Sequence, residues 1–268
     1  MLQIENFLYA SDLAEAYATL HSVPKSVILG GCGYLRLGAR SITTAIDLSQ
    51  LRLDFVRETG NAVEIGAMTT LRTLETDSAA VNLGNGVLKR AVENIVGVQL
   101  RHCVTIGGTV AARYPFSDPI TALLALDTEL VFYKHGRVSL EQYLASTGYK
   151  DILEKIVIPI DGRLAAFTSL RKAKTDYSVL NVAVAKKAAE YRVIVGSRPG
   201  RAMNANAAAE YLHINGLDSA TAAEAGRLAA ESLQFGDNPR GSGHYRKAVC
   251  PVLIKRALAD VIEVMHAA

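Results

Sequence analysis

The fold is decided by the stretch Thr105-Ile-Gly-Gly-Thr-Val-Ala-Ala-Arg-Tyr-Pro-Phe-Ser-Asp118. Gly107 and Gly108 carry no β-carbon, so the backbone at this point can approach a ligand closely. The hydroxyls of Thr105 and Thr109 flank the two glycines. The segment therefore has the composition of a ligand-binding turn.

The Ser117-Asp118 pair at the end of this stretch has two interpretations. Either residue can cap a helix that begins at Pro119, because a short polar side chain satisfies the first free N–H groups of a helix. Alternatively, the carboxylate of Asp118 accepts hydrogen bonds from a polar ligand such as a ribityl chain. The residues alone leave both interpretations open.

A second glycine-rich segment, Ile28-Leu-Gly-Gly-Cys-Gly-Tyr-Leu35, follows a predicted strand that begins at Ser26. Consecutive N–H groups in such a segment can form a nest for a phosphate. It is not a Rossmann fingerprint, because the residues after Gly31-Cys-Gly33 are Tyr-Leu-Arg and the third glycine is missing. Taken alone, the segment is equally compatible with a tight turn.

Composition narrows the possible classes of protein. The chain has 268 residues, 50% of them hydrophobic, and a formal net charge of +3, which favours two domains and indicates no nucleic-acid partner. Three dispersed cysteines predict no disulfide framework, and no spacing predicts a metal site. No apolar run is long enough for a membrane span, so we expect a cytoplasmic protein.

The order of predicted elements indicates a domain boundary near residue 160, where the pattern of strands and helices changes. Strands alternate with short helices before this point, including a helix that Ser11 caps and that runs through Leu20, and a helix at Val87–Val96. After it come three β-rich segments and then Ala-rich helical stretches, which is typical of a small α+β domain.

Together, five segments in order resemble the FAD-binding subunits of molybdenum hydroxylases, the family of xanthine dehydrogenase and carbon monoxide dehydrogenase medium subunits. The segments are Leu29–Leu35, Ile65-Gly-Ala-Met-Thr-Thr-Leu71, Thr105–Leu130, Asp151-Ile-Leu-Glu-Lys-Ile-Val-Ile-Pro159 and Asp237-Asn-Pro-Arg-Gly-Ser-Gly-His-Tyr-Arg246. They span nearly the whole chain.

The resemblance implies an α+β fold with a two-part FAD-binding domain of the vanillyl-alcohol-oxidase type. This domain would occupy residues 1–160, with parts at roughly 1–50 and 51–160, and a C-terminal domain would occupy residues 161–268. The cofactor contacts that it implies are Leu29, Gly30, Gly31, Cys32, Gly33, Tyr34, Leu35, Ile95, Thr105, Gly108, Thr109, Asp118 and Leu153.

The chain departs from the family pattern at several of these positions. Cys32 and Gly33 stand where relatives usually have small polar residues, and Tyr34 stands where Asp or a similar residue is common. Thr109 replaces the commoner Asn. A Lys of many relatives is replaced by Ser169, and we expect Lys172 to supply positive charge instead.

The resemblance implies electron transfer without a catalytic acid or base on this chain. Electrons would arrive from a two-cluster iron–sulfur subunit beside a molybdenum-cofactor subunit, pass through FAD, and leave to NAD+ or another acceptor. Two alternatives remain, a free-standing flavin oxidoreductase of the same fold and a structural subunit that has lost FAD.

Overall fold

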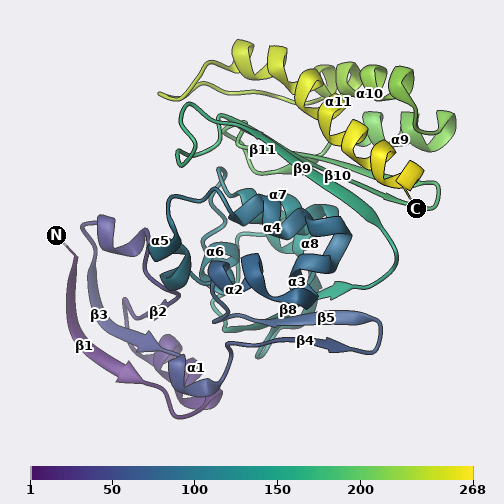
Figure 1. The fold of residues 1–268 in the computed structure, drawn as a ribbon. Helices are drawn as coiled ribbons and strands as arrows, with labels where there is room; N and C mark the ends of the chain where they lie inside the picture. Colours follow the sequence, from purple (N-terminus) through teal and green to yellow (C-terminus); the bar gives the residue numbers. More distant parts are fainter. Residues whose placement is uncertain (1, 268) are drawn as a thin grey trace.

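The N-terminal part of the chain is a small parallel sheet. A computed structural model describes residues 2–267, in which the strand order of this sheet is β1-β3-β2. The strands are β1 (Gln3–Tyr9), β2 (Val27–Leu29) and β3 (Ser41–Asp47), and helix α1 (Leu13–Ser22) connects the first two (Figure 1). The helix is capped by Asp12, which accepts a hydrogen bond from the N–H of Glu15 at 2.8 Å. The cap predicted at Ser11 is therefore one residue too early, and Ser11 instead donates from its N–H and its hydroxyl to the carboxylate of Glu15.

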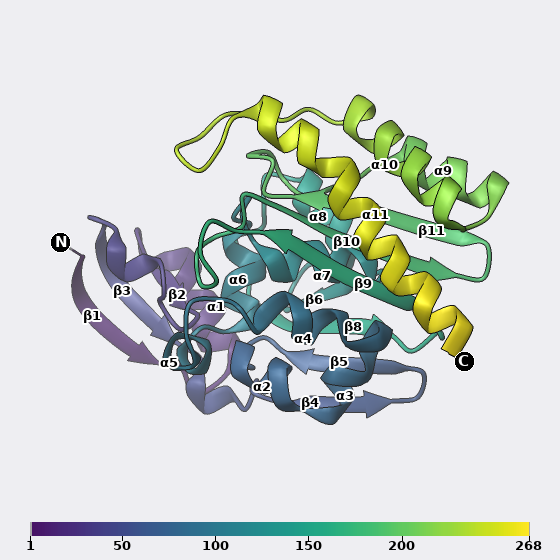
Figure 2. The ribbon, with the colours of Figure 1, turned by 45° about the horizontal axis from the view of Figure 1, so that its top comes forward.

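A five-stranded antiparallel sheet follows, with the order β4-β5-β8-β6-β7. Its strands are β4 (Val56–Thr59), β5 (Ala62–Gly66), β6 (Glu129–Phe132), β7 (Gly136–Ser139) and β8 (Leu153–Pro159). Helices α2 (Leu71–Thr76), α3 (Ser78–Asn82), α4 (Val87–Val92), α6 (Ile106–Ala112), α7 (Asp118–Ala125) and α8 (Leu140–Ala145) lie on one side of the sheet, and α5 (Val98–Cys103) lies beside the N-terminal sheet (Figure 2). Short 3₁₀ turns lie at η1 (Leu35–Leu37), η2 (Ser49–Leu51) and η3 (Leu83–Gly86).

Two segments of this region differ from the sequence-based expectation. The helix predicted at Val87–Val96 ends at Val92, because the chain turns through Val96, whose φ is +49°. The buried guanidinium of Arg101 donates to the carbonyl of Ile95 at 3.1 Å and holds this turn. The glycine-rich stretch after Thr105 is helix α6, with Thr105 as its N-cap.

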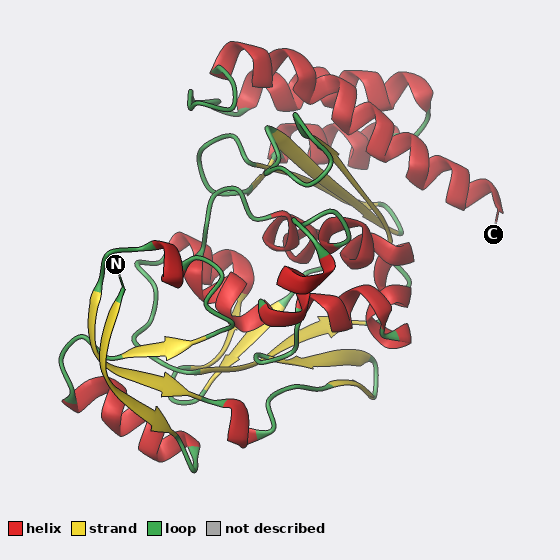
Figure 3. Cartoon of the chain, turned by 60° about the vertical axis from the view of Figure 1, so that its left-hand side comes forward, coloured by secondary structure: helices red, strands yellow, loops and turns green. Residues whose placement is uncertain are grey.

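The C-terminal part is an antiparallel sheet with the order β12-β11-β10-β9. Its strands are β9 (Leu164–Leu170), β10 (Leu180–Lys187), β11 (Glu190–Gly196) and β12 (Met203–Asn204), and its outer helices are α9 (Asn206–Asn215), α10 (Ser219–Ser232) and α11 (Gly243–Ala267). Figure 3 shows this sheet lying between the outer helices and the helices of the preceding region.

Helix α7 is the element on which the two larger parts of the chain meet. All eight of its residues are buried, and it packs against β10 and β11 of the C-terminal sheet. Strand β10 is consequently apolar on both faces, since α7 lies on one side and α11 on the other. The chain crosses between these parts at residues 160–163, where the sequence predicts a domain boundary.

Candidate functional site: the two glycine segments

The two glycine-rich segments lie directly against each other. A β-carbon on Gly30 would lie 2.7 Å from the Cα of Gly108, and one on Gly108 would lie 2.5 Å from the carbonyl oxygen of Gly30. Both distances are shorter than real β-carbon contacts. These glycines are therefore needed for a contact between two backbones of the chain itself, which the sequence did not reveal.

The first segment bends through two consecutive left-handed residues. Gly31 has φ of +77° and Cys32 has φ of +55°. Gly31 also faces the backbone of α5, because a β-carbon there would lie 1.9 Å from the carbonyl oxygen of Cys103. This position accepts no residue other than glycine without a shift of the backbone.

The bend leaves a run of unpaired backbone donors. Within residues 2–267, the N–H groups of Gly31, Cys32, Gly33 and Tyr34 donate to no acceptor of the protein. Successive free N–H groups in a bend that contains left-handed residues can form a nest for an anion. The segment therefore fits the pyrophosphate of a dinucleotide such as FAD.

The second segment has its backbone donors already occupied. The N–H groups of Ile106 and Gly107 donate to the carbonyls of Thr69 and Ala67 at 2.9 and 2.8 Å. The N–H of Gly108 donates to the hydroxyl of Thr105 at 3.1 Å. Because of these bonds, helix α6 supports the first segment by packing, and any contact of Thr105, Gly108 and Thr109 with FAD stays a prediction.

An aromatic cluster of Tyr34, Tyr114, Phe116 and Tyr177 stands beside the first segment. The ring of Tyr34 lies 4.7 Å from that of Tyr114, 5.4 Å from that of Phe116 and 5.9 Å from that of Tyr177, between ring centroids. The cluster joins the first glycine segment, the connector between α6 and α7, and the loop between β9 and β10. Of this group, only Tyr34 was predicted from the sequence as a cofactor contact.

Asp118 lies in a buried polar network between the two larger parts of the chain. Its carboxylate pairs with Arg171 and accepts hydrogen bonds from Ser178 at 2.7 Å and Asn181 at 2.5 Å. Burial raises the pKa of Asp118, and Arg171 opposes this shift most among the polar neighbours. The cap of α7 is Ser117, whose hydroxyl accepts from the N–H of Ile120. Of the two candidates for the cap, Ser117 holds that role, and contact between Asp118 and a ribityl chain stays a prediction.

Arg171, Ser178 and Asn181 were not selected from the sequence. One signal was present, since Asn181 interrupts an otherwise apolar strand and is fully buried. Its amide also donates to Ser197 at 3.1 Å, and its oxygen accepts from Thr121 at 2.9 Å.

The remaining predicted contacts lie on separate elements. Ile95 is half-buried in the turn after α4, and Leu153 is buried at the start of β8. Lys172 is exposed, with its Nζ 3.5 Å from the carbonyl oxygen of Pro239. The cofactor contacts predicted for these three residues stay predictions.

The last motif has a structural basis. Arg246 is fully buried and donates to the carbonyls of Val179 at 2.8 Å and Gly236 at 2.7 Å, and to the side chain of Asn238 at 2.6 Å. It thereby fixes the loop before α11 to the C-terminal sheet. A buried arginine held by these hydrogen bonds explains this part of the motif without a ligand.

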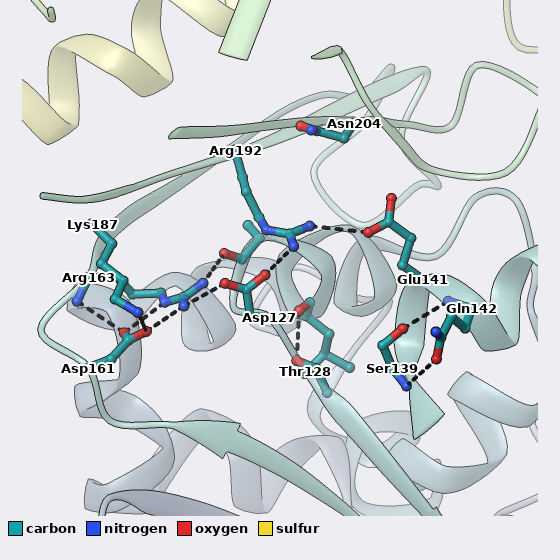
Figure 4. Close-up of polar contacts among 12 residues, drawn as sticks. Asp127, Thr128, Ser139, Glu141, Gln142, Asp161, Arg163, Lys187, Arg192 and Asn204 are labelled. Atoms are coloured by element: carbon teal, nitrogen blue, oxygen red, sulfur yellow. Dashed lines mark hydrogen bonds and ion pairs between the residues drawn. The ribbon is translucent and has the colours of Figure 1, made fainter. Parts of the chain in front are cut away.

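A second ion-pair network lies beyond the other end of α7 (Figure 4). Arg163 contacts Asp127 at 2.7 Å and the carbonyl of Ala125 at 2.9 Å, and Asp127 also pairs with Arg192 of β11. The side chain of Arg163 additionally binds Asp161, and the contact lowers the pKa of that carboxyl to about 2. Helix α7 is therefore tied to the C-terminal sheet at both ends.

Residues 2–267 contain no helix long and apolar enough to cross a membrane. Over the same range, no three His, Cys, Asp or Glu side chains gather as metal ligands would.

Two family models match the chain. Residues 2–161 match the FAD binding domain in molybdopterin dehydrogenase, and residues 165–261 match the CO dehydrogenase flavoprotein C-terminal domain. The first match alone covers more than half of the 268 residues.

Similar proteins include an uncharacterized protein of Escherichia coli, medium subunits of oxidoreductases, and solved structures of the same fold. YgfM of Escherichia coli K12 is 29% identical over 81% of this chain and 79% of its own. The nicotine 6-hydroxylase medium subunit of Paenarthrobacter nicotinovorans is 26% identical, covering 87% and 88%. A chain of quinoline 2-oxidoreductase from Pseudomonas putida 86 superimposes with a TM-score of 0.88 at 20% identity, covering 98% and 97%. The predicted two-domain α+β fold is confirmed by these matches.

Proposed function

Because this chain belongs to the FAD-binding medium subunits of the molybdenum hydroxylase family, we propose that it passes electrons from iron–sulfur clusters of a partner through FAD to NAD+ or another acceptor. The observation that carries the proposal is the run of four unpaired N–H groups from Gly31 to Tyr34. They form an anion site beside a second glycine segment, as a dinucleotide cofactor requires.

The residues that would hold FAD lie on both glycine segments. The first segment, Leu29 to Leu35, would bind the pyrophosphate through its backbone N–H groups, and α6 would keep that segment in place. Thr105, Gly108, Thr109 and Asp118 are proposed for the adjoining part of the cofactor, and Ile95, Leu153 and Lys172 for the region of its ring. When bound, FAD supplies the electron-accepting and electron-donating chemistry.

The protein's own contribution is binding and orientation. The glycine contacts fix the shape of the cradle, and the buried Asp118 network fixes the loop between β9 and β10 against α7. We assign no proton transfer to any side chain. Oxidation of the substrate is proposed to take place on a molybdenum-cofactor subunit, which is why the pocket for that substrate is sought on another chain.

The proposal also includes the partner of the chain, the role of the complex and its location in the cell. We propose a complex with a two-cluster iron–sulfur subunit, because an electron carrier needs a donor and this sequence contains no cluster-binding cysteine motif. We propose a xanthine dehydrogenase-like role from the order of the sequence motifs. A cytoplasmic location is proposed because the three cysteines are free and dispersed.

The proposal predicts which proteins co-purify with the chain. A tagged chain expressed in its native cell is expected to bring down two partners, and metal analysis of the complex should find both molybdenum and iron. Once reduced, the purified complex should transfer electrons to NAD+ or to another acceptor that is tested in parallel with NAD+. Recovery of the chain as a lone flavoprotein that oxidises a substrate, without molybdenum or iron, would contradict the proposal.

A further inference from the structure

Strand β1 is the outermost strand of the N-terminal sheet (Figure 1). It is hydrogen-bonded to β3 on one side, and within residues 2–267 no strand pairs with its other side. Six of its seven residues are exposed, the exception being Leu8. A strand edge in this condition presents a row of backbone N–H and C=O groups to which another extended segment can bind.

The other outer strands of the three sheets are protected against such pairing. Strands β4 and β7 expose the charged side chains of Arg57, Glu58 and Arg137. Strands β2 and β12 are only three and two residues long, and β9 has no exposed residue. Charged side chains, short strands and covered edges are the usual forms of protection. By contrast, β1 is seven residues long and contains a single charged residue, Glu5.

The side chains of β1 add an apolar surface to this edge. Ile4, Phe7 and Tyr9 are 42%, 48% and 58% exposed. Phe7 and Tyr9 lie on the same face of the strand, with their ring centroids 4.9 Å apart, and Ile4 lies on the opposite face. Exposed apolar side chains on both faces of a free strand edge are typical of a surface that another strand covers.

We propose that β1 is an interaction surface to which an extended segment of a partner subunit adds as a fourth strand of the sheet. The inference rests on the proposed function, which requires partner subunits. The free backbone edge of β1 binds the backbone of the added segment, and Ile4, Phe7 and Tyr9 contact its apolar side chains.

The direction of the existing strands favours a different protein over a second copy of this chain. Strand β3 pairs in parallel with both β1 and β2. Two copies related by a twofold axis would pair β1 with β1 in the antiparallel direction. Sheets with a single type of pairing are over-represented in proteins, so a strand of a partner subunit that runs parallel to β1 fits this sheet better.

Hydrogen–deuterium exchange tests the pairing at the backbone. The amides of Gln3–Tyr9 are expected to exchange about tenfold or more slowly in the complex purified from the native cell than in the isolated full chain, because the added strand supplies acceptors in place of water. Strand β4 is the control, since its charged edge should exchange at the same rate in both samples.

The substitution Phe7→Lys tests the side-chain contacts. Because Phe7 is exposed, the melting temperature and the FAD content of the isolated chain are expected to stay unchanged. The iron recovered per tagged chain from the native cell should fall about tenfold or more, since the lysine places an unpaired charge inside the interface. Val252→Lys on α11 is the matched control, since Val252 is 47% exposed, and it should retain the iron.

Three results would overturn the assignment. The first is equal exchange of β1 in the complex and in the isolated chain, and the second is full iron recovery with Phe7→Lys. The third is a dimer of the isolated chain, detected by light scattering, in which β1 is protected, because the added strand would then belong to a second copy. A chain that assembles through β1 and binds no FAD would keep this interface and contradict the proposed function alone.

Discussion

Gly31→Ala is expected to abolish FAD binding and to lower the free energy of unfolding by about 3 kcal/mol or more. The added β-carbon would lie 1.9 Å from the carbonyl oxygen of Cys103, and the backbone at this residue has a φ of +77°. To relieve the overlap with Cys103, the first glycine segment must shift away from α5. This shift would displace the unpaired N–H groups that are proposed to bind FAD. Flavin content after purification and urea-induced unfolding measure the two effects.

Gly38→Ala is the matched control for this experiment. It lies just after the same segment, has an ordinary φ of −82°, and its β-carbon would meet only the carbonyl of Leu35 at 3.4 Å. The control should retain full flavin content. Normal flavin content in Gly31→Ala would show that the cradle does not need the conformation described here.

Asp118→Ala is expected to destabilise the chain by about 3–5 kcal/mol, because it leaves the guanidinium of Arg171 buried without its partner. Ser178 and Asn181 also lose the acceptor of their hydrogen bonds. Denaturant unfolding of the FAD-free chain measures this loss. Glu129→Ala is the control variant. It breaks the exposed ion pair with Arg137, and the free energy of unfolding is expected to fall by less than about 1 kcal/mol.

A double-mutant cycle separates the pair from the rest of the network. Arg171→Met in the Asp118→Ala background should restore part of the lost stability, since no unpaired charge then remains buried. A stability of Asp118→Ala equal to that of the unaltered chain would contradict the buried network. If the FAD affinity of folded Asp118→Ala also falls about tenfold or more, the predicted ribityl contact is supported.

The sequence predicted the elements whose signals are local. The helix starting near Pro119 and the strands of the C-terminal sheet follow from proline and apolar patterns. Helix α6 was not predicted, because two adjacent glycines in Thr105–Ala112 favour a loop, and the bonds to Ala67 and Thr69 that help to stabilise the helix are tertiary.

The partners of the candidate site residues could not be predicted, because they are distant in the sequence. Gly30 meets Gly108, and Asp118 meets Arg171 and Asn181, through contacts that exist only after the sheets have packed. The glycines were interpreted as points of close approach to a ligand. The structure shows that at Gly30 and Gly108 the close approach is between two segments of the protein.

The most direct test of the account is the flavin content of the purified full chain, measured by its absorption spectrum before and after denaturation. We expect one FAD per chain, released into solution on denaturation, because the cradle offers backbone N–H groups and no covalent attachment is predicted. A chain purified without flavin, and unable to bind added FAD, would contradict the central claim that the paired glycine segments form an FAD site.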